Sequence, residues 1–158
     1  MTNPVPVGFL KHPVHFLALG FGSGMVPKLP GTAGTLAGVL IYFFLSTLPV
    51  TYYAGVLLLF FLAGIWICDK TAMDLGVHDH PAIVWDEIVG YLVTMIYVPG
   101  GWLWMIAGFV LFRLFDIWKP WPINRVDKSI SGGFGIMLDD VIAGIFGLCI
   151  LQITAYLL

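Results

Sequence analysis

Charged side chains are scarce in this chain. Only 10% of its 158 residues are charged, 59% are hydrophobic and the mean hydropathy is +0.97, whereas about a quarter of the residues in soluble globular domains are charged. This composition predicts an integral membrane protein, and the length favours one domain over residues 1–158. A net charge of −2, with no basic tract among the seven Lys and Arg residues, argues against nucleic-acid binding.

Cysteine is also rare, and this excludes several kinds of chemistry. Cys68 and Cys149 both lie in apolar runs, as buried small hydrophobic residues do, so neither a disulfide framework nor a zinc site is indicated. Neither has an Arg six positions later, as the loop of a cysteine phosphatase requires. The chain lacks the serine-hydrolase elbow and the zinc-protease motif.

Its first ten residues are uncharged and lead into no long apolar core, so no cleaved signal peptide is expected.

Long runs without charge are what the sequence has in abundance. Residues 29–68 form one run that is broken near Pro49, which predicts a hairpin of hydrophobic helices at about residues 33–48 and 50–68. Further runs follow Glu87, Gly101 and the last acidic pair. The expected fold is all-α, a polytopic membrane helical bundle of about five hydrophobic helices, with a short interfacial helix at residues 9–19. Because two runs are short, a re-entrant hairpin with three or four spans is the alternative.

The charged residues all fall on one side when the chain is threaded back and forth through a bilayer. Every charged side chain lies on the side that contains the N-terminus, while the turns at Pro49 and at residues 99–101 carry none. Lys and Arg residues collect in cytoplasmic loops of membrane proteins. The sequence therefore predicts that this charged side faces the cytoplasm.

Two acidic pairs stand where apolar runs begin, Asp86-Glu87 and Asp139-Asp140. Each pair alone could be stabilised by a helix macrodipole by about 0.3 to 1 kcal/mol. Two pairs and two more aspartates at one membrane face would repel one another and lose hydration, which favours a bound cation. Carboxylates near phosphate oxygens suit Mg²⁺. The predicted metal ligands are Asp69, Asp86, Glu87, Asp116, Asp139 and Asp140, and all of these except Asp69 are also predicted to be catalytic.

A glycine-rich segment could bind the opposite charge. Residues 20–24 and 31–35 supply glycines, hydroxyl groups and backbone N–H groups, and Lys28 adds a positive charge, which together form an anion cradle ahead of a helix. The alternative is a Gly/Pro turn before a helix whose small residues pack against neighbours. The predicted phosphate-binding residues are Lys28, Gly31, Thr32, Thr35, Arg113 and Lys119.

Other polar residues have two open interpretations. Arg113, Asp116 and Lys119 are spaced to lie along one side of a helix, where they could form a site or only an internal salt bridge. His78 and His80 flank Asp79 and could transfer protons or be ordinary solvated loop histidines.

With these residues in view, the chain resembles the phosphatidylglycerophosphatase A family of bacterial membranes. The family's blocks occur here in order from about Phe16 to Gly144 and cover most of the chain. They are residues 20–24 (GFGSG), 30–32 (PGT), 76–80 (GVHDH), 83–87 (IVWDE), 115–123 (FDIWKPWPI) and 132–140 (GGFGIMLDD).

The resemblance implies an all-helical enzyme of the bacterial inner membrane, multi-pass, with its active site at the cytoplasmic face. It implies Mg²⁺-dependent hydrolysis of the phospholipid phosphatidylglycerophosphate to phosphatidylglycerol and inorganic phosphate, in glycerophospholipid biosynthesis.

The expected mechanism has one or two Mg²⁺ ions that polarise the phosphoryl group and activate water, while cations and N–H groups neutralise phosphate oxygens. An aspartyl-phosphate intermediate is the rival chemistry. The alternative functions are a small membrane transporter, a structural subunit, or a phosphatase for other lipid or isoprenoid phosphates. A transporter would be expected to carry polar groups near mid-membrane rather than at one face.

Overall fold

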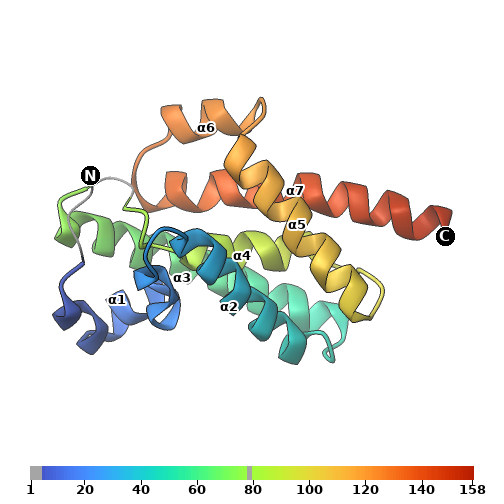
Figure 1. Ribbon diagram of the computed structural model, residues 1–158, viewed down its shortest axis with the longest axis horizontal. Helices are drawn as coiled ribbons and strands as arrows, with labels where there is room; N and C mark the ends of the chain where they lie inside the picture. The colour runs from blue at the N-terminus through green and yellow to red at the C-terminus, as the bar shows by residue number, and fades with distance from the viewer. Residues whose placement is uncertain (1–4, 78–79) are drawn as a thin grey trace.

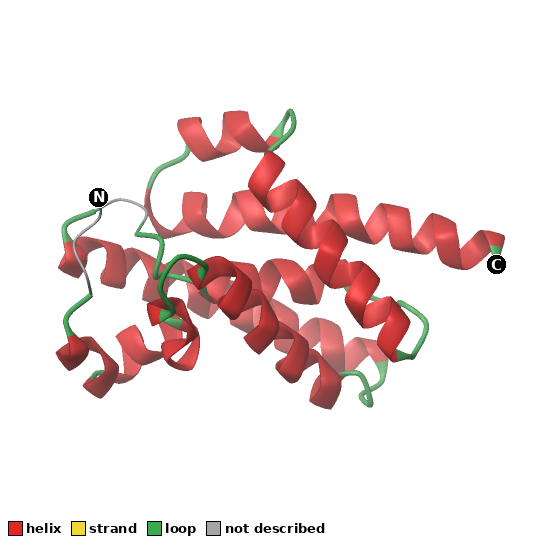
Figure 2. Ribbon diagram, viewed as in Figure 1, coloured by secondary structure: helices red, strands yellow, loops and turns green. Residues whose placement is uncertain are grey.

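The computed structural model describes residues 5–77 and 80–158, and within these ranges the chain is built from helices without any strand (Figures 1 and 2). The all-α expectation is therefore confirmed. The described elements, in chain order, are η1 (Val7–Lys11), α1 (Pro13–Ala18), η2 (Gly20–Met25), α2 (Pro30–Leu45), α3 (Val50–Leu75), α4 (Trp85–Thr94), α5 (Trp102–Trp118), α6 (Ile123–Ser129) and α7 (Gly132–Leu157).

The short helix α4 is the centre of the bundle. It packs against α2, α3, α5 and α7, and every one of its residues except Glu87 is buried. Glycines allow its backbone to approach α7 closely, because a Cβ atom on Gly144 would collide with the Gly90 carbonyl oxygen and lie 3.0 Å from Val93 Cβ. Many of the largest fully buried side chains of the bundle belong to α4 or lie near it, and they include Tyr91, Ile88, Leu92, Met95, Phe112 and Met137.

The outer faces of the surrounding helices are apolar. On α5 the exposed residues recur every three or four positions and so form one continuous stripe, Leu103, Ile106, Val110, Leu114 and Ile117. Similar exposed residues lie on α2, α3 and α7. Apolar surface of this extent is unusual for a monomeric soluble protein and is typical of a surface that contacts lipid or another protein.

The number of spans differs from the expected five. Among the described residues, only α3 and α7 are both long and apolar enough to cross a membrane. Helix α4 has ten residues, which cover about 15 Å, roughly half of a hydrocarbon core of about 30 Å. The helix ends at Thr94, so the residues of the uncharged run from Met95 to Gly101 form a non-helical connection to α5. The five expected helices are present, but five membrane spans are not confirmed.

The connections that carry no charge lie at one end of the bundle. Figure 1 places the α2–α3 and α4–α5 connections at the same end as the C-terminus, and α1 and α6 at the other end. Charged residues of three helices lie toward this second end, namely Asp69 and Lys70 in α3, Asp86 and Glu87 at the start of α4, and Arg113 and Asp116 near the end of α5. The charge therefore gathers at one end of the fold.

The expected N-terminal helix is broken in two. Pro13 opens α1 after the extended residue His12, so η1 and α1 replace one helix over residues 9–19. Helix α1 packs on α3 through the buried His15, whose Nδ1 lies 2.9 Å from Thr71 Oγ1 and whose Nε2 lies 3.2 Å from the Asp74 carboxylate.

We expect Gly144→Ala to lower the free energy of unfolding by about 1 to 3 kcal/mol, because the added methyl group forces α7 away from α4. The matched control is Gly55→Ala in α3, where an added Cβ meets nothing within 4 Å, so its effect should stay within about 1 kcal/mol. Thermal unfolding in detergent measures both. Equal effects of the two variants would contradict the close packing described here.

Candidate active site

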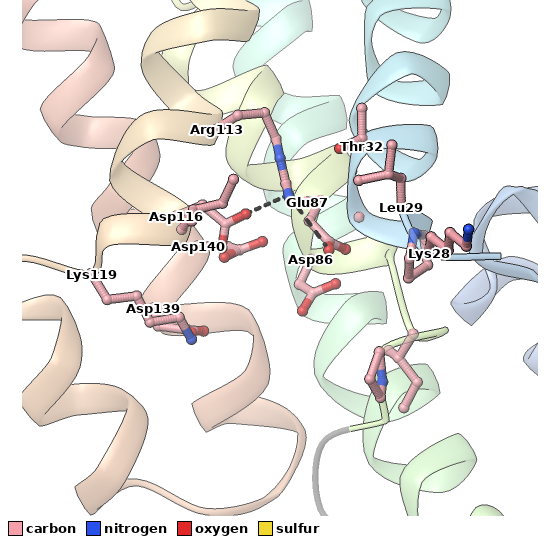
Figure 3. Close-up of a pocket in the computed structure, with 15 residues that line it drawn as sticks. Lys28, Leu29, Thr32, Asp86, Glu87, Arg113, Asp116, Lys119, Asp139 and Asp140 are labelled. Carbon is pink, nitrogen blue, oxygen red and sulfur yellow. Dashed lines mark hydrogen bonds and ion pairs between the residues drawn. The ribbon is translucent and has the colours of Figure 1, made fainter. Parts of the chain in front are cut away.

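A cavity of about 340 Å³ lies where the first turns of α2 and α4 meet the end of α5 and the first half of α7 (Figure 3). These segments are far apart in the sequence, and the packing around α4 brings them together. The cavity is lined by all five residues predicted to be catalytic and by five of the six predicted to bind phosphate, namely Asp86, Glu87, Asp116, Asp139, Asp140, Lys28, Gly31, Thr32, Arg113 and Lys119.

Three carboxylates from two helices converge in this cavity. One oxygen each from Asp86, Glu87 and Asp140 can be chosen so that all lie within 4.8 Å of one another. Asp140 is only 3% exposed, and the buried atoms Glu87 Oε2 and Asp140 Oδ2 have no hydrogen-bond partner within residues 5–77 and 80–158. Buried carboxylates this close repel one another. A hard cation would satisfy these oxygens, and an all-oxygen donor set suits Mg²⁺.

The neighbouring aspartates are instead paired with basic side chains. Lys119 Nζ donates hydrogen bonds to Asp139 Oδ2 and Asp127 Oδ1, each at 2.6 Å. Burial lowers the pKa of the Lys119 ammonium group, but these two hydrogen bonds outweigh it and hold the pKa above its usual value. Asp139 and Asp140 are adjacent in sequence, yet one is tied to a lysine and the other faces the carboxylate cluster.

Arg113 joins the cluster to α5. It pairs with Asp116 one turn along the helix, and its Nη1 lies 3.8 Å from Glu87 Oε1. The salt-bridge interpretation of the Arg113, Asp116 and Lys119 spacing is confirmed for Arg113 and Asp116. All three residues line the cavity, and their role as a site stays a prediction.

The start of α2 lies against this arginine. Gly31 is in the first turn of α2, and a Cβ atom there would collide with the Glu87 carboxylate and lie 2.8 Å from Arg113 Nη1. A glycine is therefore needed for the close approach. N–H groups in the first turn of a helix have no partner within the helix, so this turn can donate to an anion in the cavity.

Thr35 lies outside the cavity. It is fully buried, and its hydroxyl donates to the Gly31 carbonyl oxygen at 2.8 Å. It therefore holds the first turns of α2 in place, and the structure gives no contact between Thr35 and the cavity.

The two acidic pairs occupy different positions in their helices. Asp86 and Glu87 are in the first turn of α4, as expected, where the macrodipole favours them. Asp139 and Asp140 lie about two turns inside α7, which begins at Gly132. The expectation that this pair marks a helix start is wrong, because the preceding glycine-rich segment is itself helical. The capping explanation therefore does not account for Asp140.

Asp69 lies apart from the carboxylate cluster. Its Oδ1 accepts a hydrogen bond from the Gly133 N–H at 2.8 Å, and it lines a different cavity beside α7. A Cβ atom on Gly133 would clash with the backbone of α3, so α7 begins directly on α3. Asp69 thus holds the N-terminal end of the helix that carries Asp139 and Asp140.

The histidines are only partly placed. His78 and its neighbour Asp79 lie outside the described residues. His80 is buried, and its Nδ1 accepts the Ala82 N–H at 3.2 Å. It lines a second cavity next to the acidic one.

Asp127 was not predicted to belong to the site. It lies on α6 and reaches Lys119 across the turn that contains Pro120 and Pro122. Its position between Arg125 and Lys128 in the sequence favoured an ordinary solvated loop, so only the folded turn reveals its role.

Comparisons of the sequence with known proteins identify the family of this chain. A sequence profile described as phosphatidylglycerophosphatase A matches residues 16–155. The chain belongs to the phosphatidylglycerophosphatase A family. The phosphatidylglycerophosphatase A of Escherichia coli (strain K12) is 46% identical over 148 residues, which cover 93% of this chain and 86% of that protein. The protein of the same name from Haemophilus influenzae (strain ATCC 51907) is 45% identical over 157 residues, covering 98% of this chain and 96% of that protein.

One relative carries a different name. A protein from Bacteroides thetaiotaomicron (strain ATCC 29148), provisionally named a phosphatidylinositol-3-phosphatase, is 37% identical over 150 residues, which cover 90% of this chain and 93% of that protein. No solved structure matches the chain significantly.

The carboxylate cluster predicts a divalent-cation site that Asp69 does not share. We expect Mn²⁺, which is visible by electron paramagnetic resonance and suits oxygen ligands, to bind the wild type. Glu87→Gln should weaken this binding at least about tenfold, since even indirect partners of a metal contribute that much. Asp69→Asn is the matched control and should bind Mn²⁺ as the wild type does. Equal weakening in both variants would contradict the assignment of the site.

Proposed function

We propose that this chain is a Mg²⁺-dependent lipid phosphatase that hydrolyses phosphatidylglycerophosphate to phosphatidylglycerol and inorganic phosphate, as part of glycerophospholipid biosynthesis. The observation that carries the proposal is the cluster of the Asp86, Glu87 and Asp140 carboxylates beside Arg113, in a chain of the phosphatidylglycerophosphatase A family. The names of two relatives at 45–46% identity support this substrate.

Asp86, Glu87 and Asp140 would hold the metal. The fit rests on their all-oxygen donor set and on the two buried carboxylate oxygens that have no hydrogen-bond partner in the described chain. When bound, Mg²⁺ would supply Lewis-acid polarisation of the phosphoryl group. Asp116 and Asp139, which are paired with Arg113 and Lys119, would take part by setting the positions of these two cations.

The remaining residues of the cavity would orient the phosphate. Arg113 can donate to phosphate oxygens from a position that its salt bridge with Asp116 fixes. Gly31 and Thr32 line the same cavity, and N–H groups in the first turn of a helix are available to donate to an anion. Lys119 adds a second positive charge at the opposite wall, where it holds the Asp139 carboxylate. Because these groups are held in place before substrate binds, little reorganisation is needed during the reaction.

The setting of the site suits a lipid phosphate. We infer a multi-pass protein of the bacterial inner membrane whose charged end, with the cavity, faces the cytoplasm. The apolar outer faces of α2, α3, α5 and α7 would contact acyl chains, so a phospholipid can present its phosphate to the cavity without leaving the bilayer.

A second candidate substrate class is another phosphorylated phospholipid, and the name of the Bacteroides thetaiotaomicron relative favours it. Phosphatidylglycerophosphate and phosphatidylinositol 3-phosphate share one chemistry. Each has a terminal phosphomonoester on a polyol that is joined to diacylglycerol through a phosphodiester. A transporter is less well supported, since the charged residues gather at one end of the bundle.

We expect phosphate release from phosphatidylglycerophosphate in detergent micelles to require Mg²⁺ and to stop in EDTA. Asp86→Asn should lower kcat about a hundredfold or more, because the charge that binds the metal is lost. Asp74→Asn is the control, since Asp74 pairs with Lys70 and His15 away from the cavity. Release that needs neither Mg²⁺ nor Asp86 would rule out the proposal.

A further inference from the structure

The three basic residues of the acidic cavity are not equivalent. Arg113 and Lys119 are both bound to carboxylates. Within the described parts of the chain, Lys28 has no carboxylate partner, and it is exposed. Figure 3 shows the Lys28 side chain extending away from the acidic cluster, while Arg113 and Lys119 reach in among the carboxylates.

Lys28 stands at the border between two cavities. The second cavity, of about 460 Å³, is mostly apolar and lies next to the acidic one. The two cavities share Lys28, Pro30 and Pro81 as lining residues. The rest of the second cavity is formed by Val5, Gly24, Met25, Val26, Pro27, His80 and Ala82.

The backbone at Lys28 is held in an unfavourable conformation. Its φ is +70°, in the left-handed region that a residue with a side chain seldom adopts. The residue follows Pro27 and stands two positions before Pro30, where α2 begins. Such conformations persist where the surrounding structure imposes them and are concentrated at binding sites. Here the result is a lysine at the boundary of an acidic and an apolar cavity.

We propose that Lys28 binds the internal phosphodiester of the substrate, while the scissile phosphomonoester lies in the acidic cavity and the diacylglycerol end lies toward the apolar one. This inference rests on the proposed function, because it needs a lipid with both phosphate groups. The acidic cluster repels a second anion, so that anion must lie outside it. Lys28 is the pocket lysine whose charge is not already opposed by a carboxylate of the described chain. Lys28 would therefore select lipids that carry a phosphodiester in addition to a terminal phosphate.

The test compares phosphatidylglycerophosphate with phosphatidic acid, which has the terminal phosphomonoester but no phosphodiester. In Mg²⁺-containing micelles, Lys28→Gln should lower kcat/KM for phosphatidylglycerophosphate about tenfold, mainly through KM, as expected for loss of a charged hydrogen bond. The rate with phosphatidic acid should change less than about twofold. Lys28→Arg should restore most of the loss. Lys11→Gln, an exposed lysine that lines neither cavity, is the matched control.

Product inhibition provides a second measurement that does not depend on turnover of phosphatidic acid. Phosphatidylglycerol keeps the phosphodiester, so its inhibition should weaken about tenfold in Lys28→Gln, whereas inhibition by inorganic phosphate should not change.

Three results would overturn the inference. Equal losses on both lipids would place Lys28 on the scissile phosphate, unchanged kinetics with phosphatidylglycerophosphate would remove Lys28 from the site, and unchanged inhibition by phosphatidylglycerol would exclude the phosphodiester contact. A wild type that releases phosphate from neither lipid would refute the proposed function itself, which is a separate outcome.

Discussion

The structure depends on a costly arrangement, in which two buried carboxylates and one half-buried carboxylate lie side by side in a cavity toward the charged end of the helical bundle. Asp86 and Glu87 enter from the first turn of α4, and Asp140 enters from the interior of α7. Negative charges in a site of low dielectric constant repel one another, and each loses its hydration. Salt bridges to Arg113 and Lys119 offset the repulsion and the lost hydration for the neighbouring aspartates Asp116 and Asp139. In our account a bound cation offsets the same two costs for the carboxylate cluster.

Glycines make that arrangement sterically possible. At Gly31 the missing side chain lets Glu87 and Arg113 reach the first turn of α2, and at Gly90 and Gly144 it lets α4 and α7 touch along their backbones. The same residues that reduce helix propensity therefore bring the acidic groups and the first turn of α2 together in one cavity. Helix packing and the shape of the cavity therefore depend on the same three glycines, because a methyl group at any of them would push apart the helices that line the cavity.

Much of this could be predicted from the sequence. The runs without charge predicted the five hydrophobic helices. The acidic pairs, Arg113 and Lys119 predicted most of the charged residues that line the cavity, because charged residues are few in this chain and each one is easily noticed. Helix ends were harder. The Asp139-Asp140 pair was expected at a helix start, but the glycine-rich residues before it are helical and pack on α3, with the Asp69 carboxylate at the N-terminal end of α7. The predictions for Asp69 and Thr35 placed both in the site, whereas their side chains bond to backbone groups beside it.

The central claim is that the carboxylate cluster is unfavourable until a cation binds it. The most direct test compares the thermal unfolding midpoints of the wild type and Asp140→Asn, in EDTA and in saturating Mg²⁺. Our account predicts a change of sign. In EDTA the variant should unfold at a higher temperature than the wild type, because one of the repelling charges is gone. In Mg²⁺ it should unfold at a lower temperature, because a ligand is gone. A variant that is less stable by the same amount in both conditions would contradict the account.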